Sequence, residues 1–130
     1  MIRSIKPQRV LVIDDEQVIC DACHLILSEQ GCQVEHQLTG TAGLLAIENS
    51  DFDVVLLDLK LPDMDGMEVL RRVGKEKPGL SVIVMTGFST TLTAVEAMKN
   101  GATDYLGKPF TEDELITTIE NAHSSNAERT

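Results

Sequence analysis

The segment Phe52-Asp-Val-Val-Leu-Leu-Asp58 decides the fold, because its four apolar residues, Val54 to Leu57, run without a break into a carboxylate. A short continuous run of this kind, half of it β-branched, is typical of a strand buried on both faces. The next segment, 60–66, is rich in turn-forming Pro, Asp and Gly. Asp58 is therefore expected where a buried strand ends and a loop begins, at the edge where open parallel sheets bind ligands. We predict that Asp58 is the reactive group of the protein.

Similar strand and helix patterns alternate along the rest of the chain. The predicted strands are 10–13, 33–38, 51–58, 81–85 and 104–107, and the predicted helices are 17–30, 41–49, 66–77, 91–100 and 111–123. Alternation of this kind predicts a parallel sheet with helices on both faces. We expect an α/β fold of the flavodoxin-like (βα)5 type, with a doubly wound five-stranded sheet in the order 2-1-3-4-5.

The helical segments carry recognisable start signals. Thr39 and either Thr90 or Thr91 are expected N-caps, and Thr111 with Glu114 forms a capping box. Apolar residues of these helices are expected to face the core. They are positions 18, 19, 22, 23, 25, 26 and 27 in the first helix, Ala42, Leu44, Leu45 and Ile47 in the second, and Leu92, Val95, Ala97 and Met98 in the fourth.

The bulk composition is that of one globular domain of 130 residues, with 42% hydrophobic and 25% charged residues. We expect an N-terminal extension at 1–8, the domain at 9–123, and a polar tail or linker start at 124–130. No apolar run approaches the ~20 residues of a membrane helix, and no secretion signal is present, so a cytoplasmic location is expected. The net charge of −10 argues against direct nucleic-acid binding by this domain.

Three cysteines, at 20, 23 and 32, are an odd number in a chain of this kind, which argues against a disulfide framework. Cys20-x-x-Cys23-His24 has the spacing of a haem-attachment or redox motif, but it lies inside a predicted helix. We interpret the thiols as ordinary buried or half-buried side chains. The histidines are expected at the surface or half-buried, without convergence, and they are His24, His36 and His123.

Polar residues follow four of the five predicted strands: Asp14 with Asp15, then Asp58, Thr86 and Lys108. In the order 2-1-3-4-5 these strand ends share one edge, and strands 1 and 3 are adjacent. The crowded carboxylates would repel one another, and Mg²⁺ would relieve that repulsion. Taken singly, each residue is explained by capping, turn formation or surface exposure. Together, carboxylates, cation, ammonium and hydroxyl indicate phosphoryl transfer.

These residues also resemble a known family. The chain is similar to the receiver domain of two-component response regulators over nearly its whole length, most of all to receivers of NtrC-like enhancer-binding transcriptional activators. The similarity is carried by Val-Leu-Val-Ile-Asp14-Asp15-Glu, Leu-Leu-Asp58-Leu-Lys-Leu-Pro62-Asp-Met-Asp-Gly66, Val-Met-Thr86-Gly and Gly101-Ala-Thr-Asp-Tyr105-Leu-Gly-Lys108-Pro109-Phe110.

The resemblance implies a role for each matched residue. Asp58 would accept a phosphoryl group from a sensor histidine kinase or a phosphotransfer protein. Mg²⁺ would be held by Asp14, Asp15, Asp58 and the main-chain carbonyl of Lys60. Thr86 and Lys108 would bind the phosphoryl oxygens.

The resemblance also implies a conformational switch. Thr86 and Tyr105, expected to be lateral neighbours, would move on activation, and Tyr105 would turn inward. The Lys108–Pro109 bond would be cis. Further expected partners are an output domain beyond Thr130, used in transcription regulation, and a second copy docked through the last two helices and the strand between them.

Two other classes of protein share parts of this pattern. A Mg²⁺-dependent phosphohydrolase with an aspartyl nucleophile needs a general acid near that nucleophile and a substrate cap, but Lys60 occupies the expected place of the acid and no cap insertion exists. A flavodoxin-type module needs a Ser/Thr/Gly-rich phosphate loop after the first strand, which Asp14-Asp15-Glu16 opposes. We therefore expect a phosphorylation switch that catalyses only its own phosphoryl transfer and autodephosphorylation, and not an enzyme.

Overall fold

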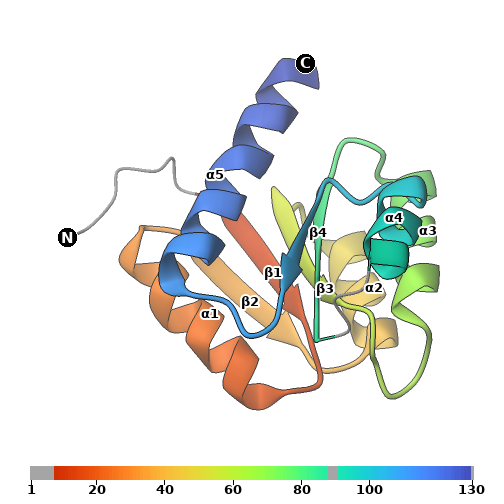
Figure 1. Ribbon diagram of the computed structural model, residues 1–130, viewed down its shortest axis with the longest axis horizontal. Helices are drawn as coiled ribbons and strands as arrows, with labels where there is room; N and C mark the ends of the chain where they lie inside the picture. Colours follow the sequence, from red (N-terminus) through yellow and green to blue (C-terminus); the bar gives the residue numbers. More distant parts are fainter. Residues whose placement is uncertain (1–7, 88–90, 130) are drawn as a thin grey trace.

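The structure, a computed structural model, describes residues 8–87 and 91–129 (Figure 1). Strands and helices alternate through the described chain. They are β1 (Arg9–Ile13), α1 (Gln17–Glu29), β2 (Gln33–Gln37), α2 (Gly40–Asn49), β3 (Val54–Asp58), α3 (Gly66–Glu76), β4 (Ser81–Thr86), α4 (Thr91–Lys99), β5 (Asp104–Gly107) and α5 (Glu112–Arg129). None of these helices, within the described residues, has both the length and the apolar composition needed to cross a membrane.

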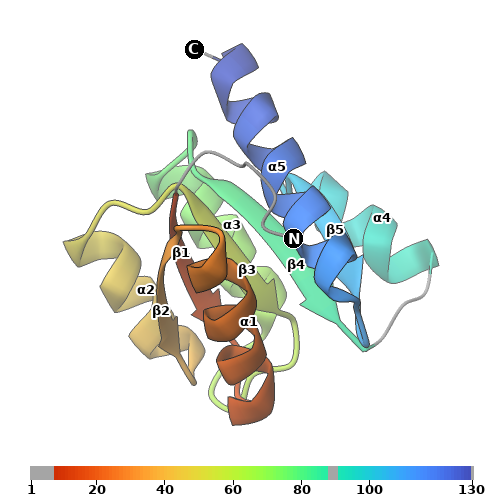
Figure 2. The ribbon, with the colours of Figure 1, turned by 90° about the vertical axis from the view of Figure 1, so that its left-hand side faces the viewer.

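All strand pairs are parallel, and the sheet order β2-β1-β3-β4-β5 confirms the predicted doubly wound topology. Helices α1 and α5 pack on one face of the sheet, and α2, α3 and α4 pack on the other (Figure 2). β3 lies in the middle, and each of its five residues is buried. Val54 and Leu56 belong to the core under α1 and α5, whereas Val55 and Leu57 belong to the opposite core. This two-sided burial explains why the strand is continuously apolar.

The predicted helix signals are present in the structure. The hydroxyl oxygen of Thr39 accepts a hydrogen bond from the Ala42 main-chain N–H at 3.1 Å. The capping box is also confirmed, since Glu114 N–H donates to the Thr111 hydroxyl at 3.1 Å and Thr111 N–H donates to the Glu114 carboxylate at 2.9 Å. Helix α4 begins at Thr91, and the alternative cap, Thr90, lies outside the described residues.

Several apolar residues predicted to face the core are instead exposed. They are Val18 and Leu25 on α1, Leu45 on α2, and Leu92, Val95 and Met98 on α4. Helix α2 packs through Gly40, Gly43 and Ile47. A Cβ on Gly43 would collide with the side chain of Ile13, so the two elements lie too close for a larger residue there. The buried side of α2 is therefore marked by glycine, which apolar periodicity cannot detect.

Helix α5 is longer than predicted, because it continues past residue 123 to Arg129. The segment 124–129 is polar and lacks apolar periodicity, which predicts the end of the helix, but it contains neither Pro nor Gly. Polar residues lack the apolar periodicity that reveals packing against a core, but they can still form a helix.

Candidate functional site

The polar residues predicted at the strand ends meet at one edge of the sheet. Together with the start of α1 they line an open pocket of about 530 Å³. The lining residues are Asp15, Glu16, Ile19, Asp58, Lys60, Thr86, Gly87, Lys108 and Pro109. Asp14 lies beside this pocket and is fully buried, and Asp58 is 4% exposed. The order of the strands thus brings side chains from the whole length of the chain to one place.

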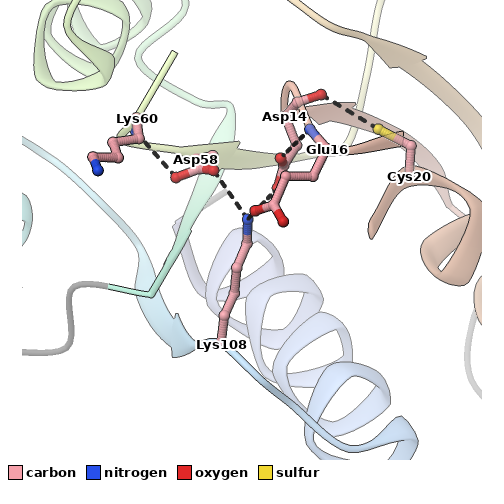
Figure 3. Close-up of polar contacts among 6 residues, drawn as sticks. All are labelled: Asp14, Glu16, Cys20, Asp58, Lys60 and Lys108. Carbon is pink, nitrogen blue, oxygen red and sulfur yellow. Dashed lines mark hydrogen bonds and ion pairs between the residues drawn. The ribbon is translucent and has the colours of Figure 1, made fainter. Parts of the chain in front are cut away.

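The ammonium group of Lys108 lies at the centre of the site (Figure 3). Its Nζ is 2.6 Å from Asp14 Oδ2, 2.9 Å from Asp58 Oδ2 and 2.9 Å from Glu16 Oε1. Burial disfavours the charge on Lys108, but its ion pair with Asp14 and its hydrogen bonds to Glu16 and Asp58 outweigh that effect and raise its pKa. The side chain therefore remains a fixed positive charge.

The other oxygens of the two buried carboxylates are held by main-chain donors. The N–H of Glu16 donates to Asp14 Oδ1 at 2.9 Å, and the N–H of Lys60 donates to Asp58 Oδ1 at 3.0 Å. Burial raises the pKa of Asp14, with the nearby charge of Asp58 adding to the shift and the contacts from Lys108 and Glu16 N–H opposing it. Both carboxylates are thus fixed in orientation before any ligand arrives.

The chemistry of the donor set fits a small hard cation. Asp14, Asp15, Glu16 and Asp58 each offer a carboxylate oxygen, and these four oxygens lie within 4.8 Å of one another. Oxygen ligands beside an open, water-accessible pocket suit Mg²⁺. Glu16 is not among the predicted ligands, although it directly follows the predicted pair Asp14-Asp15.

The loop after Asp58 is folded tightly back on itself. Lys60 and Asp65 form an isolated antiparallel bridge, and Gly66 N–H donates to the Leu59 carbonyl at 3.0 Å. A Cβ on Gly66 would lie 2.7 Å from the Asp58 carbonyl oxygen. Glycine at this position therefore allows α3 to begin directly against the end of β3, and it fixes the path of the main chain at Lys60.

Thr86 and Tyr105 lie on adjacent strands, but they are not directly opposite each other. In the register of β4 and β5, Thr86 pairs with Gly107, and Tyr105 pairs with Val84. The two residues are thus lateral neighbours on adjacent strands, as predicted, but they are offset by two residues, and alternation along a strand keeps both on one face of the sheet. Thr86 is buried, and Tyr105 is half-buried against the core beneath α2, α3 and α4. The Lys108–Pro109 bond is cis, as predicted.

The three thiols are buried, in agreement with the sequence interpretation. Burial raises the pKa of Cys20 to about 11 and that of Cys23 to about 12, so both remain protonated near neutral pH. Cys20 Sγ donates to the carbonyl of Asp14 at 3.5 Å (Figure 3).

Two histidines, which were expected not to converge, do lie together: His24 on α1 contacts His36 on β2. That pairing was missed because the residues belong to different elements, and only the face of the sheet that they share could have indicated it.

A five-stranded doubly wound sheet in this strand order defines a flavodoxin-like domain, and its switch point carries buried carboxylates and an ammonium group. The chain matches the response regulator receiver domain over residues 10–120, and it belongs to that family. It is therefore a domain of two-component signal transduction.

The chain is similar to known regulators in sequence and in structure. It is 37% identical over 123 residues to the transcriptional regulatory protein ZraR of Escherichia coli K12, a match that covers 92% of this chain and 28% of that protein. Identity to the cell cycle transcriptional regulator CtrA of Caulobacter vibrioides NA1000 is 37% over 111 residues, covering 85% of this chain and 48% of that regulator.

Among solved structures, a CheY-like receiver domain protein from Methanospirillum hungatei JF-1 has a TM-score of 0.91 and 34% identity, covering 96% of this chain and all of that one. NtrX from Brucella abortus has a TM-score of 0.90 and 32% identity, covering 95% of this chain and 29% of NtrX. The chain thus spans between about a quarter and a half of the length of the curated relatives described here.

Proposed function

We propose that Asp58 accepts a phosphoryl group from a sensor histidine kinase or a phosphotransfer protein. The observation that carries this proposal is the position of Lys108, whose ammonium group contacts Asp58 and Asp14 at the end of the central strands. A buried carboxylate with a fixed cation beside it can receive an anionic group without adding an uncompensated charge.

In the proposed reaction, a carboxylate oxygen of Asp58 attacks the phosphorus of a phosphohistidine. The P–O bond forms as the P–N bond breaks, and the leaving imidazole recovers a proton from solvent. Lys108 and the Thr86 hydroxyl would bind oxygens of the transferred group, while Lys60 N–H keeps the other carboxylate oxygen of Asp58 in place. The same site would later admit water, which would hydrolyse the acyl phosphate on Asp58 and release inorganic phosphate. This autodephosphorylation would be the only other reaction of the domain.

Mg²⁺ is the proposed cofactor. Asp14, Asp15, Asp58 and the carbonyl of Lys60 would hold it, with Glu16 near enough to contribute. When bound, the ion would neutralise charge on the phosphoryl oxygens during transfer. Lys108 already contacts three of these carboxylates, so a metal ion would share the cluster with it.

We further propose that phosphorylation changes the surface formed by α4, β5 and α5. Thr86 and Tyr105 would carry the change, since they lie on one face of the sheet between Asp58 and that surface. The exposed apolar side chains of Leu92, Val95 and Met98 on α4 support a contact there with an output domain or a second copy of the chain.

The receiver unit proposed here comprises 9–123, preceded by an extension at 1–8 and followed by the start of a linker at 124–130. Because the curated relatives are transcriptional regulators much longer than this chain, we propose an output domain beyond Thr130 that acts in transcription regulation. Three buried thiols agree with action in the cytoplasm.

The test is labelling by a small phosphodonor in the presence of Mg²⁺. The protein should form one acid-stable, base-labile adduct, as expected for an acyl phosphate. Asp58→Asn should lose the adduct, since an amide is not a nucleophile here, and Asp15→Ala should form it slowly because the metal site is weakened. Full labelling of Asp58→Asn would show that the acceptor is another residue.

A further inference from the structure

His24 on α1 and His36 on β2 form a pair of imidazoles outside the acidic pocket. His24 Nε2 lies 3.0 Å from His36 Nδ1. The ring centroids are 5.1 Å apart, and the ring planes are perpendicular. Both side chains are half-buried, so the pair is in contact with solvent. Neither residue lines the pocket around Asp58.

The fold fixes both partners of this pair. His36 pairs with Val12 in the register of β1 and β2, and Val12 faces the core beneath α1 and α5. Side chains at paired positions of neighbouring strands point to the same side, so His36 faces α1 from the edge of the sheet. On α1, His24 follows the buried Cys23 and lies one turn after the buried Cys20, which places it at the margin of the packed stripe.

The distance between the two nitrogens is that of two ligands of one metal ion. Zinc binds imidazole nitrogen at about 2.0–2.1 Å, so two such ligands at roughly tetrahedral or right angles lie about 2.9–3.4 Å apart. The observed 3.0 Å falls within that range. The two elements therefore already hold these nitrogens at a spacing that one ion can bridge.

We propose that His24 and His36 form a binding site for a divalent transition metal ion such as Zn²⁺, Ni²⁺ or Cu²⁺. Neutral imidazole prefers these ions, whereas Mg²⁺ prefers oxygen. Without metal, an N–H of one ring donates to the nitrogen of the other, so the pair is satisfied and already assembled. The site is thus chemically distinct from the acidic pocket.

The rest of the ligand set is water or a group from outside the described chain. Among the described side chains, those of residues 8–87 and 91–122, the acidic pocket alone brings three or more His, Cys, Asp or Glu ligand atoms close enough to share one ion. Cys23 is adjacent in sequence, but its side chain is fully buried in the core beneath α1 and α5 rather than beside the two imidazoles at the edge of the sheet. Two ligands from separate elements would tie α1 to β2, so bound metal stabilises the folded state.

The experiment follows thermal unfolding of the whole chain during titration with Ni²⁺ at about pH 7.5, where ordinary histidines are neutral. Excess Mg²⁺ is present to occupy the acidic pocket. The wild type should show a rise in Tm with Ni²⁺. His24→Gln and His36→Gln should each bind Ni²⁺ more than about tenfold more weakly. Loss of a residue that merely supports a metal ligand already weakens binding by about that much, and these variants remove a ligand itself. The third histidine supplies the matched control, because His123→Gln should respond like the wild type.

A two-dimensional NMR titration of the wild type locates the bound ion without any substitution. Signals of residues near His24 and His36 should change first, and Asp15→Ala should leave those changes intact. Changes confined to residues 14–16 and 58 would assign Ni²⁺ to the acidic pocket and overturn the proposal. A Tm rise that persists in both single variants, or the absence of any response up to millimolar Ni²⁺, would overturn it equally.

Discussion

Asp14 and Lys108 illustrate how strongly single residues depend on each other in this site. Asp14 is fully buried and the side chain of Lys108 is 10% exposed, so the charge of Asp14 is compensated mainly by Lys108, and that of Lys108 mainly by Asp14 and Asp58. Removing one partner of a buried pair leaves an unpaired charge, which costs more than the pair itself contributes. A substitution at either position would therefore lower both the reactivity of the site and the stability of the fold. Substitutions in the surrounding loop separate these two effects better.

Gly66 is the first such position. A Cβ here would collide with the main chain at Leu59 and lie 2.7 Å from the Asp58 carbonyl oxygen. Gly66→Ala should destabilise the fold by about 3 kcal/mol or more, at the upper end of overpacking costs, because main-chain atoms cannot rotate away. It should also weaken Mg²⁺ binding, since the path of the loop through Lys60 changes. Urea unfolding and an NMR titration with Mg²⁺ measure the two effects.

The matched control is Gly79→Ala, because a Cβ at Gly79 would meet no atom within 4 Å. That variant should unfold near the wild-type midpoint and bind Mg²⁺ normally. If Gly66→Ala behaved like Gly79→Ala in both measurements, close packing at the start of α3 would not control the site.

Asp63, in the same loop, caps a different helix. Its carboxylate accepts hydrogen bonds from Gly40 N–H at 2.8 Å, from Thr41 N–H at 2.9 Å and from the Thr41 hydroxyl at 2.5 Å. The Thr41 hydroxyl and these N–H groups lower the pKa of Asp63 to about 2. The loop after Asp58 is thereby attached to the start of α2, a contact that no local sequence signal on α2 would indicate.

Asp63→Asn should destabilise the protein near neutral pH, and the difference from wild type should depend on pH. Because the folded-state pKa lies below the ordinary value, the contribution of the carboxylate is complete above about pH 4 and is lost as the pH falls toward 2. Urea midpoints at several pH values should therefore converge in acid. Asp51→Asn is the control, since Asp51 contacts Arg9 through its main-chain carbonyl. A difference for Asp63→Asn that stayed constant down to pH 2.5 would contradict the capping role of the charge.

At the level of elements, the sequence predicts the five strands and the meeting of their polar ends well, because the strands and the residues that end them follow local signals. Continuous apolar runs identify β1, β3 and β4, and parallel topology alone then brings Asp14, Asp58 and Lys108 to one edge. Features that arise only from packing are not visible in the sequence. The glycine face of α2, the offset between Thr86 and Tyr105, and the contact between His24 and His36 all depend on how elements approach one another.

The β4–β5 pair provides a prediction at this scale. Thr86 pairs with Gly107, so no neighbouring side chain lies directly opposite it on β5, and Tyr105 lies two positions away on the same face. Phosphoryl oxygens on Asp58 would attract the Thr86 hydroxyl, and the Tyr105 ring would follow into the altered space. Thr86→Ala should still accept phosphate, but NMR shift changes across 91–122 with a phosphoryl mimic should be smaller than in wild type. Thr86→Ser, which keeps the hydroxyl, should restore them, whereas equal changes in all three proteins would exclude this route.

For the molecule as a whole, the sheet separates two cores that share the same strands. Ile119 of α5 is fully buried on one side, and Leu70 of α3 is 1% exposed on the other. Adjacent residues of β3 contribute to opposite cores, so loss of packing on either side loosens the strand that both sides need. A domain of this size is expected to unfold as one cooperative unit.

Ile119→Ala and Leu70→Ala should therefore each reduce the stability of the entire domain. The expected cost is about 2–5 kcal/mol for each large-to-small change in the core, a substantial share of the about 5–15 kcal/mol typical of such domains. Amide signals from both faces of the sheet should disappear at one shared, lowered urea midpoint in each variant. Leu92→Ala is the control, because Leu92 is 81% exposed and its truncation should change stability by less than about 0.5 kcal/mol. If Ile119→Ala released α1 and α5 at a lower urea concentration than α2 and α3, the two cores would be independent units, and a signal from Asp58 could then reach α5 without altering the opposite face.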